Sequence, residues 1–161
     1  MAAHKTNAAR LLDKAHIPYE LIEYQVDEND LSAVHLAEQL NLPKDQLFKT
    51  ILLRGDKNGV FVCVIPGDQE VDLKLAAKAS ENKKADTVPV KELLPLTGYI
   101  RGGCSPIGMK KNYPVFIDEQ CSQHLHIYLS AGQRGLQLKM KPEDLIKAVN
   151  ATVCCLAKDT R

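Results

Sequence analysis

The chain has almost no net charge. Its 161 residues include 21 Lys and Arg against 20 Asp and Glu, which gives a formal charge of +1. A protein with this balance does not bind nucleic acid through its overall electrostatic field. Any contact with RNA must come from a local group of basic residues, and DNA is not an expected partner.

Long hydrophobic runs are also missing. The longest apolar segments, such as Val60–Ile65, have the length of one β-strand, whereas a helix that crosses a bilayer needs about 20 apolar residues. The first residues pass directly into an amphipathic pattern, without the apolar core of a secretory signal. These features predict a cytoplasmic protein with no membrane partner.

The cysteines lack a pairing pattern. They are odd in number, and neither a CxxC motif nor a Cys/His spacing connects Cys63, Cys104, Cys121, Cys154 and Cys155. This argues against a disulfide framework and a structural zinc site, so we expect reduced thiols and no metal. The phosphate-binding motif GxxxxGK[ST] and the dinucleotide motif GxGxxG are absent too, and no cofactor is predicted.

The length and the 45% hydrophobic content favour one domain over residues 1–161. Helical periodicity and capping residues predict helices over 6–16, 32–40, 72–79, 90–94 and 142–149, with Pro95 and Gly98 closing the fourth. Strands are predicted over 19–26, 47–54, 60–65, 115–118, 125–130, 136–140 and 151–156, with a short extended piece near Thr87. This order predicts an α/β (α+β) domain with a mixed, mostly antiparallel sheet.

Segment 60–65 is apolar on both faces, since Val60, Val62 and Val64 alternate with Phe61, Cys63 and Ile65. Such a pattern is typical of a central strand that is covered on both sides. It places Cys63 in the core rather than in a reactive site.

Three segments have the composition of a functional site. The first is Phe48-Lys49-Thr50, where a lysine stands among apolar neighbours at the start of a strand. Either its stem packs at an edge while the ammonium reaches water, or the ammonium points into a pocket at a phosphate or a carbonyl group.

The second segment, Gly98 to Gly108, is rich in glycine, so its backbone amides can approach a ligand and hold a developing oxyanion. From position 101 to 117 there are three basic residues, Arg101, Lys110 and Lys111, and no acidic residue. This locally positive ridge is either a solvated loop or a contact for RNA phosphates.

The third segment, Ser130-Ala131-Gly132-Gln133-Arg134-Gly135, is a strand end that enters a glycine-containing turn. Outside these segments, His124 and His126 stand two residues apart without a third ligand nearby, which favours a surface pair over a metal site. Cys104 lies in the glycine-rich loop, but no histidine partner stands beside it in the sequence.

Taken together, the three segments resemble the hallmark segments of the YbaK/EbsC family of aminoacyl-tRNA editing proteins, in order and in spacing. The stretch Pro66 to Asp72 is also similar to a segment of the editing domain that is inserted in bacterial prolyl-tRNA synthetases. The resemblance covers nearly the whole chain and implies a partly curled mixed sheet surrounded by helices. It further implies a trans-editing deacylase that clears mischarged tRNA, best known for Cys-tRNA(Pro).

The resemblance also assigns roles to residues. It implies that Lys49 and Gly102 are catalytic, that Tyr24, Thr50, Gly103, Ser105, Ser130 and Gly132 bind the substrate, and that the RNA lies along Arg101, Lys110, Lys111 and Arg134. For a cysteine substrate it implies that the substrate's own thiol attacks the ester carbonyl and leaves as a thiolactone, while the protein orients the ester and stabilises the oxyanion. The implied partners are the acceptor end of a mischarged tRNA and a synthetase such as prolyl-tRNA synthetase.

The chain departs from the family pattern at Gln137, where some members carry an acidic residue, and this leaves open which group recognises the substrate's amino group. Ala131 replaces a common glycine, and Cys104 replaces an aliphatic residue. Three activities therefore stay open: a deacylase for Cys-, Ala- or Ser-charged tRNA, a non-catalytic module that binds tRNA or a synthetase, and a hydrolase that uses Cys104.

Overall fold

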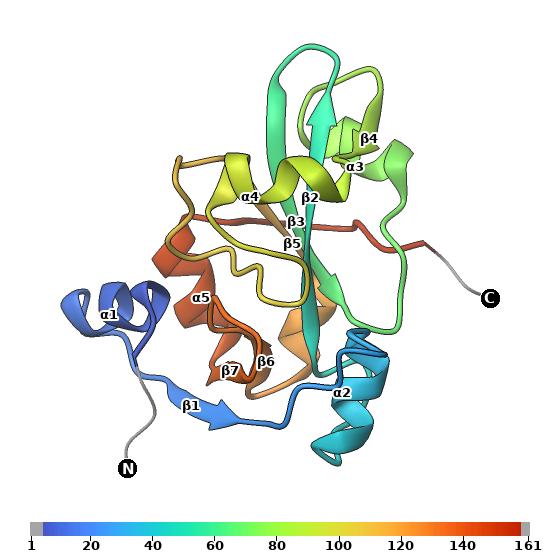
Figure 1. Ribbon diagram of the computed structural model, residues 1–161. Coiled ribbons are helices and arrows are strands. Elements are labelled where there is room, and N and C mark those ends of the chain that lie inside the picture. The colour runs from blue at the N-terminus through green and yellow to red at the C-terminus, as the bar shows by residue number, and fades with distance from the viewer. Residues whose placement is uncertain (1–4, 159–161) are drawn as a thin grey trace.

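The structure is a computed structural model that describes residues 5–158 (Figure 1). Thr6, Ser32 and Asp72 each begin a helix, because their side chains accept hydrogen bonds from backbone N–H groups of the first turn. The helices are α1 (Asn7–Lys14), α2 (Ala33–Gln39), α3 (Leu73–Ala79), α4 (Val90–Thr97) and α5 (Pro142–Val149), with the 3₁₀ helix η1 at Glu119–Gln123. Within residues 5–158 no helix combines the length and the apolar character needed to cross a membrane.

The strands form two sheets. They are β1 (Glu20–Glu23), β2 (Phe48–Gly55), β3 (Gly59–Pro66), β4 (Ala85–Thr87), β5 (Val115–Asp118), β6 (Ile127–Ser130), β7 (Leu136–Met140) and β8 (Thr152–Cys154). One sheet has the order β4-β2-β3-β5-β8 and the other β1-β7-β6, and an isolated bridge between Leu47 and Tyr128 joins them. The pairs β3–β5 and β5–β8 are parallel and the other strand pairs in the described part are antiparallel, which confirms the predicted mixed, mostly antiparallel architecture.

Strand β3 separates two hydrophobic cores. Val62 and Val64 pack into the larger core, which reaches α1, α5 and the three-stranded sheet, whereas Phe61, Cys63 and Ile65 pack with α3 on the other face. Burying one large apolar side chain contributes roughly 1.5–3 kcal/mol, so a strand buried on both faces anchors the whole sheet. The prediction of a central strand is confirmed, and burial raises the pKa of the Cys63 thiol to about 12.

Several element boundaries differ from the prediction. The fourth helix was expected to end at Leu94, but α4 continues through Pro95 to Thr97. Pro95 has no N–H to donate to the carbonyl of Lys91, and both residues lie on the exposed side of the helix. Strand β1 is shorter than predicted because residues 20–23 alone pair with β7, and β6 begins at Ile127 because its pairing with β7 starts there, opposite Met140. The 3₁₀ helix η1 over residues 119–123 was not predicted.

The carboxylate of Asp118 fixes the end of β5. The residue is 1% exposed, and Oδ1 accepts hydrogen bonds from the backbone and the side chain of Gln120, at 2.9 and 3.0 Å. Oδ2 accepts from the backbone N–H groups of Leu156 and Ala157, both at 2.9 Å. A buried carboxylate is tolerated only with such donors, so Asp118 ties η1 and the segment after β8 to the five-stranded sheet.

Replacing Asp118 with Asn should lower the free energy of unfolding by about 2–3 kcal/mol, because the amide nitrogen cannot accept these N–H groups. Urea denaturation followed by circular dichroism measures the change. Asp86→Asn is the matched control: Asp86 is exposed on β4 without a side-chain hydrogen bond in the described part, and its substitution should stay within about 0.5 kcal/mol. Equal stability of the two variants would contradict the role of Asp118.

Candidate functional site

The first residues of β2 open into a cavity of about 500 Å³. Lys49 and Thr50 line it, opposite Ile65 and Val64 of the neighbouring strand β3. The other walls come from the start of α2, the turn after β3, the glycine-rich loop and the three-stranded sheet: Leu31 to Leu36 without His35, Leu47, Phe48, Ile51, Gly67 to Glu70, Arg101, Gly102, Cys104, Ser130 and Gln137. The structure therefore brings all three sequence segments to one cavity.

The Lys49 side chain is half-buried, and its ammonium makes no hydrogen bond or ion pair within residues 5–158. Burial lowers the pKa of Lys49 below its usual range, while the carboxylates of Glu70 and Asp68 act in the opposite direction. Of the two interpretations of this lysine, the structure favours the one in which it borders a pocket. The acidic neighbours were not identified as site residues, although their segment, 66–72, was noted for its resemblance.

Two buried polar atoms in the cavity wall have no hydrogen-bond partner: Thr50 Oγ1 and Gln137 Oε1. Nearly all buried polar atoms in folded proteins are hydrogen-bonded, so an exception in a cavity wall marks a place where a ligand atom or water fits. Ser130 pairs with Gln137 across β6 and β7, and its Oγ accepts a hydrogen bond from Gly132 N at 3.2 Å. The cavity thus presents two basic residues, Lys49 and Arg101, two acidic residues, Asp68 and Glu70, and several neutral polar groups.

Gly102 and Gly103 differ in what their backbone amides do. Gly102 lines the cavity at a φ of 83°, and its N–H has no hydrogen bond within the described residues. The N–H of Gly103 is donated to Ile100 O at 2.9 Å, and Gly103 does not line the cavity. Only Gly102 of this pair can offer its amide to a ligand in this conformation.

The glycine-rich loop packs backbone to backbone against the turn after β6. A Cβ atom at Gly103 would lie 3.0 Å from Arg134 N, and a Cβ atom at Gly132 would lie 3.0 Å from the Tyr99 ring. Arg134 Nε donates to Arg101 O at 2.9 Å and so ties the two segments together. The close approach explains why glycine stands at both positions.

The remaining predicted site residues lie outside the cavity. Ser105 is fully buried, and its Oγ accepts from Ile107 N at 3.2 Å. Tyr24 lines a small neighbouring cavity that also contacts Gly102. Lys110 is exposed with its stem beside Gly98, and Lys111 borders a different cavity.

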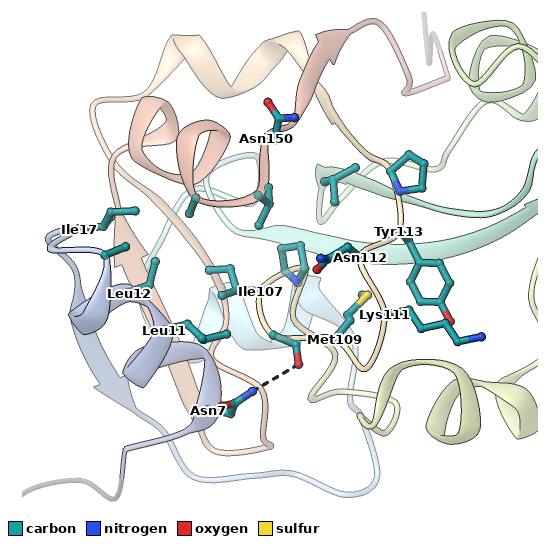
Figure 2. A pocket seen from close by; sticks show the side chains of 17 residues that line it. Asn7, Leu11, Leu12, Ile17, Ile107, Met109, Lys111, Asn112, Tyr113 and Asn150 are labelled. Atoms are coloured by element: carbon teal, nitrogen blue, oxygen red, sulfur yellow. Dashed lines mark hydrogen bonds between the residues drawn. The ribbon is translucent and has the colours of Figure 1, made fainter.

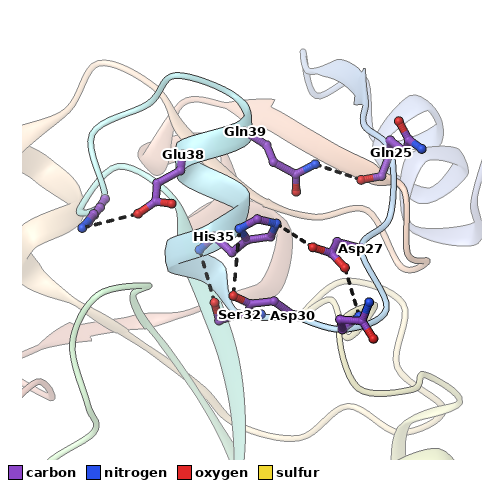
Figure 3. A network of polar contacts seen from close by, with 9 residues as sticks. Gln25, Asp27, Asp30, Ser32, His35, Glu38 and Gln39 are labelled. Atoms are coloured by element: carbon purple, nitrogen blue, oxygen red, sulfur yellow. Dashed lines mark hydrogen bonds and ion pairs between the residues drawn. The ribbon is translucent and has the colours of Figure 1, made fainter.

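A polar network holds the segment at the cavity mouth (Figure 3). His35 Nε2 lies 3.0 Å from Asp27 Oδ2, and its Nδ1 lies 3.9 Å from Asp30 Oδ2. Asp30 Oδ1 accepts from Ser32 N at 3.0 Å, and hydrogen bonds from Ser32 lower the pKa of this carboxyl. The network fixes Leu31 and Ser32, both of which line the cavity.

Cys104 lines the cavity, but burial raises the pKa of its thiol to about 12. The thiol is therefore protonated at neutral pH, which disfavours a cysteine nucleophile. His124 Nε2 lies 3.5 Å from Asp45 Oδ2, and in residues 5–158 no three His, Cys, Asp or Glu side chains are grouped closely enough to hold a metal ion.

The chain is similar to several known proteins. Residues 27–148 match the family model of the aminoacyl-tRNA editing domain. A protein of Enterococcus faecalis, named as a candidate Cys-tRNA(Pro)/Cys-tRNA(Cys) deacylase, EbsC, is 47% identical over 146 residues, which cover 91% of this chain and 89% of that protein. A proline–tRNA ligase of Lactobacillus helveticus is 31% identical over 107 residues, which are 65% of this chain and 18% of the ligase.

A solved structure described as a candidate trans-editing enzyme for prolyl-tRNA synthetase has the same fold. It superposes with a TM-score of 0.81 and 20% sequence identity, and the match covers 97% of this chain and 100% of that one. The chain belongs to the aminoacyl-tRNA editing domain family, which confirms the resemblance seen in its three segments.

Gly132→Ala should destabilise the fold by about 1–3 kcal/mol and lower ligand binding in the cavity, because a φ of 104° is strained for alanine and the new methyl group meets the Tyr99 ring. Gly59→Ala is the matched control, since Gly59 also has a positive φ but its Cβ would meet nothing within 4 Å. Thermal unfolding of both variants separates backbone strain from steric contact. A larger loss for the Gly59 variant would contradict the packing described here.

Proposed function

We propose that the protein is a trans-editing aminoacyl-tRNA deacylase whose first substrate is Cys-tRNA(Pro). The observation that carries the proposal is the half-buried Lys49 ammonium, which makes no hydrogen bond or ion pair with any residue from 5 to 158 and borders a cavity with Thr50 and Gln137. Burial of a cation without a direct hydrogen bond is unfavourable for folding, even where nearby carboxylates offset part of the cost, and such groups are often functional. The 47% identity to a protein named for this activity supports the substrate class.

The cavity residues divide the work by chemistry. Lys49 binds the terminal nucleotide or the ester carbonyl, since its ammonium is a compact cation with three donors. The N–H of Gly102, which has no hydrogen bond in the described part, donates to the oxyanion that develops on the ester carbonyl. Thr50, Ser130 and Gln137 contact the polar atoms of the amino acid, and the carboxylates of Asp68 and Glu70 line the same cavity.

For a cysteine substrate the reaction needs no protein nucleophile. The substrate thiol sulfur forms a bond to the ester carbonyl carbon, the bond from that carbon to the ribose oxygen breaks, and the thiol proton ends on the ribose hydroxyl of the released tRNA. The other product is a cyclic thiolactone. The protein then contributes orientation and charge stabilisation, which together account for large rate factors in other enzymes.

The cavity has room for a small amino acid and part of the terminal ribose, so Ala and Ser esters are tested beside Cys. The stretch shared with a proline–tRNA ligase supports tRNA(Pro), and a functional association with that synthetase in the cytoplasm, as parts of the proposal.

Lys49→Met should reduce deacylation of the preferred substrate by roughly 100-fold, the size seen when one stabilising donor is lost. Labelled amino acid released from Cys-, Ala- and Ser-tRNA(Pro) and from Cys-tRNA(Cys) measures the effect. Because burial destabilises this charge, the melting temperature of the variant should be unchanged or slightly higher. Lys57→Met, on the β2–β3 turn, controls for loss of one positive charge and should keep full activity; normal clearance by the Lys49 variant would remove this residue from the mechanism.

Deacylation of Cys-tRNA(Pro) should depend on pH through two groups. The rate should rise as the substrate thiol ionises near pH ~8.5 and fall as Lys49 loses its proton. Since the pKa of Lys49 is lowered, the fall should begin below the usual range of a lysine, and Lys49→Arg should move it to higher pH. Initial rates corrected for spontaneous ester loss test this, and identical profiles for the two proteins would contradict a role for the Lys49 charge.

A further inference from the structure

The acidic side chains Asp68 and Glu70 belong to the turn that follows β3, residues 67–70, which we call the acidic turn. Both line the first cavity, the one that Lys49 borders. A second cavity, of about 690 Å³, lies beyond the glycine-rich loop and between α1 and the end of α5 (Figure 2), and its described lining contains no Asp or Glu. Carboxylates are thus specific to the cavity of the half-buried lysine.

The backbone of the acidic turn is attached to the start of β2. Phe48 of β2 pairs with Pro66 of β3, and Gly67 N donates to Leu47 O at 2.7 Å. A Cβ atom at Gly67 would lie 2.8 Å from the same carbonyl oxygen, so the turn and the chain before Lys49 lie in direct contact. The two carboxylates therefore follow a backbone segment whose position relative to Lys49 is fixed.

A pair of glutamine side chains holds the acidic turn against η1. Gln69 Nε2 donates to Gln120 Oε1 at 2.9 Å, and Gln120 Nε2 donates to Gln69 Oε1 at 2.8 Å. Gln120 Nε2 also donates to the buried carboxylate of Asp118 at 3.0 Å. Since Asp118 ends β5, this amide pair joins the acidic turn to the five-stranded sheet.

The segment after β8 holds the other end of the acidic turn. Lys158 N donates to Glu70 O at 2.8 Å, and Lys158 Nζ lies 3.5 Å from Glu70 Oε2. Lys49, Glu70 and Lys158 also line one groove of about 270 Å³. The Glu70 carboxylate is largely exposed, but its backbone is fixed and it borders the same groove as both lysines.

The carboxylates of the acidic turn offset the burial of Lys49. Burial lowers the pKa of Lys49, whereas Glu70 and, to a smaller extent, Asp68 raise it. The other charged side chains that line the first cavity and the groove are Arg101 and Lys158, and nearby cations favour the neutral form of a lysine. Among the described residues that line these two spaces, the support for a charged Lys49 therefore comes from the acidic turn.

We propose that the Gln69–Gln120 amide pair positions the acidic turn for the reaction, so that the carboxylates of the turn lie beside Lys49 and keep it in the ammonium form. Gln120 does not line the first cavity, so it is a positioning residue that acts through the turn. The inference deepens the proposed function and rests on it for the use of the ammonium in catalysis.

The test is a pH titration of Lys49 by NMR, in the full chain labelled with ¹³C-lysine and without substrate. The Lys49 Cε signal is identified by its absence from Lys49→Met. Glu70→Gln and Asp68→Asn each remove one carboxylate and keep its shape. Glu20→Gln is the matched control, since Glu20 is exposed on β1 and lines neither the first cavity nor the groove.

Gln120→Leu removes the amide pair and leaves both carboxylates in the chain. Its matched control is Gln123→Leu, because Gln123 is an exposed glutamine of the same 3₁₀ helix and its side chain makes no hydrogen bond within residues 5–158.

The comparison is made at the pH where half of the wild-type Lys49 is neutral. There, the ratio of neutral to charged Lys49 should rise roughly two- to fivefold in Glu70→Gln and in Asp68→Asn, the range for one solvent-exposed charge pair. Gln120→Leu should raise the ratio as well, while both controls keep the wild-type value. An unchanged ratio in both carboxylate variants would overturn the inference, and an unchanged ratio in Gln120→Leu would overturn the role of the amide pair.

With Cys-tRNA(Pro) as substrate, the alkaline fall of the deacylation rate should begin at lower pH in Gln120→Leu than in the wild type. A loss of stability alone would lower the rate at every pH and leave the position of this fall unchanged. Weaker ester binding by Glu70→Gln with an unmoved Lys49 titration would overturn the inference and assign this carboxylate to the amino group of the substrate.

The titration needs no ester, so its result does not depend on deacylation. A chain whose carboxylate variants shift the Lys49 titration but which clears no ester contradicts the proposed function alone. A chain that clears the ester while the titration stays unmoved in these variants contradicts this inference alone.

Discussion

The backbone packing of residues 101–104 against residues 131–135 holds the site together. Because Gly103 and Gly132 have no Cβ atoms, the loop and the turn approach each other directly, and Arg134 bonds to the carbonyl of Arg101 across the contact. A side chain at either glycine would push the loop away from β6. Gly102 and Cys104 would then leave the cavity wall that Lys49 borders, and the second cavity would lose its loop wall as well.

Two buried or half-buried charged groups differ in whether the protein supplies hydrogen-bond partners for them. Asp118 is fully buried and receives hydrogen bonds from Gln120, Leu156 and Ala157, so its charge contributes to the stability of the sheet. Lys49 is half-buried and its ammonium donates no hydrogen bond in the described part, and burial lowers its pKa. The first charge is satisfied by the fold, whereas the second is left for a ligand.

The sequence predicted the elements whose evidence is local. The alternation in residues 60–65 indicated a strand buried on both faces. The apolar neighbours of Lys49 left an edge lysine and a pocket lysine both open, and the structure favours the second. Contacts between distant segments were not predictable in this way. The N–H of Gly103 donates to Ile100 O within a turn, and Ser105 Oγ accepts from Ile107 N in the same loop. Arg134 Nε donates to the carbonyl of Arg101. Each of these contacts depends on how the loop folds back in three dimensions. The continuation of α4 through Pro95 was not predictable either, because proline is a common signal for the end of a helix.

The strands that line the first cavity lie far apart in the sequence. Lys49 is on β2, which forms a local hairpin with β3, whereas Ser130 and Gln137 stand on β6 and β7, and β7 pairs with the distant β1. Pairing between strands so distant in sequence is slow, because the entropy of closing a long loop must be overcome first. On the ribosome, therefore, the hairpin that carries Lys49 emerges and can form while β6 and β7 are still unsynthesised, and a nascent chain holds the lysine without the pocket around it.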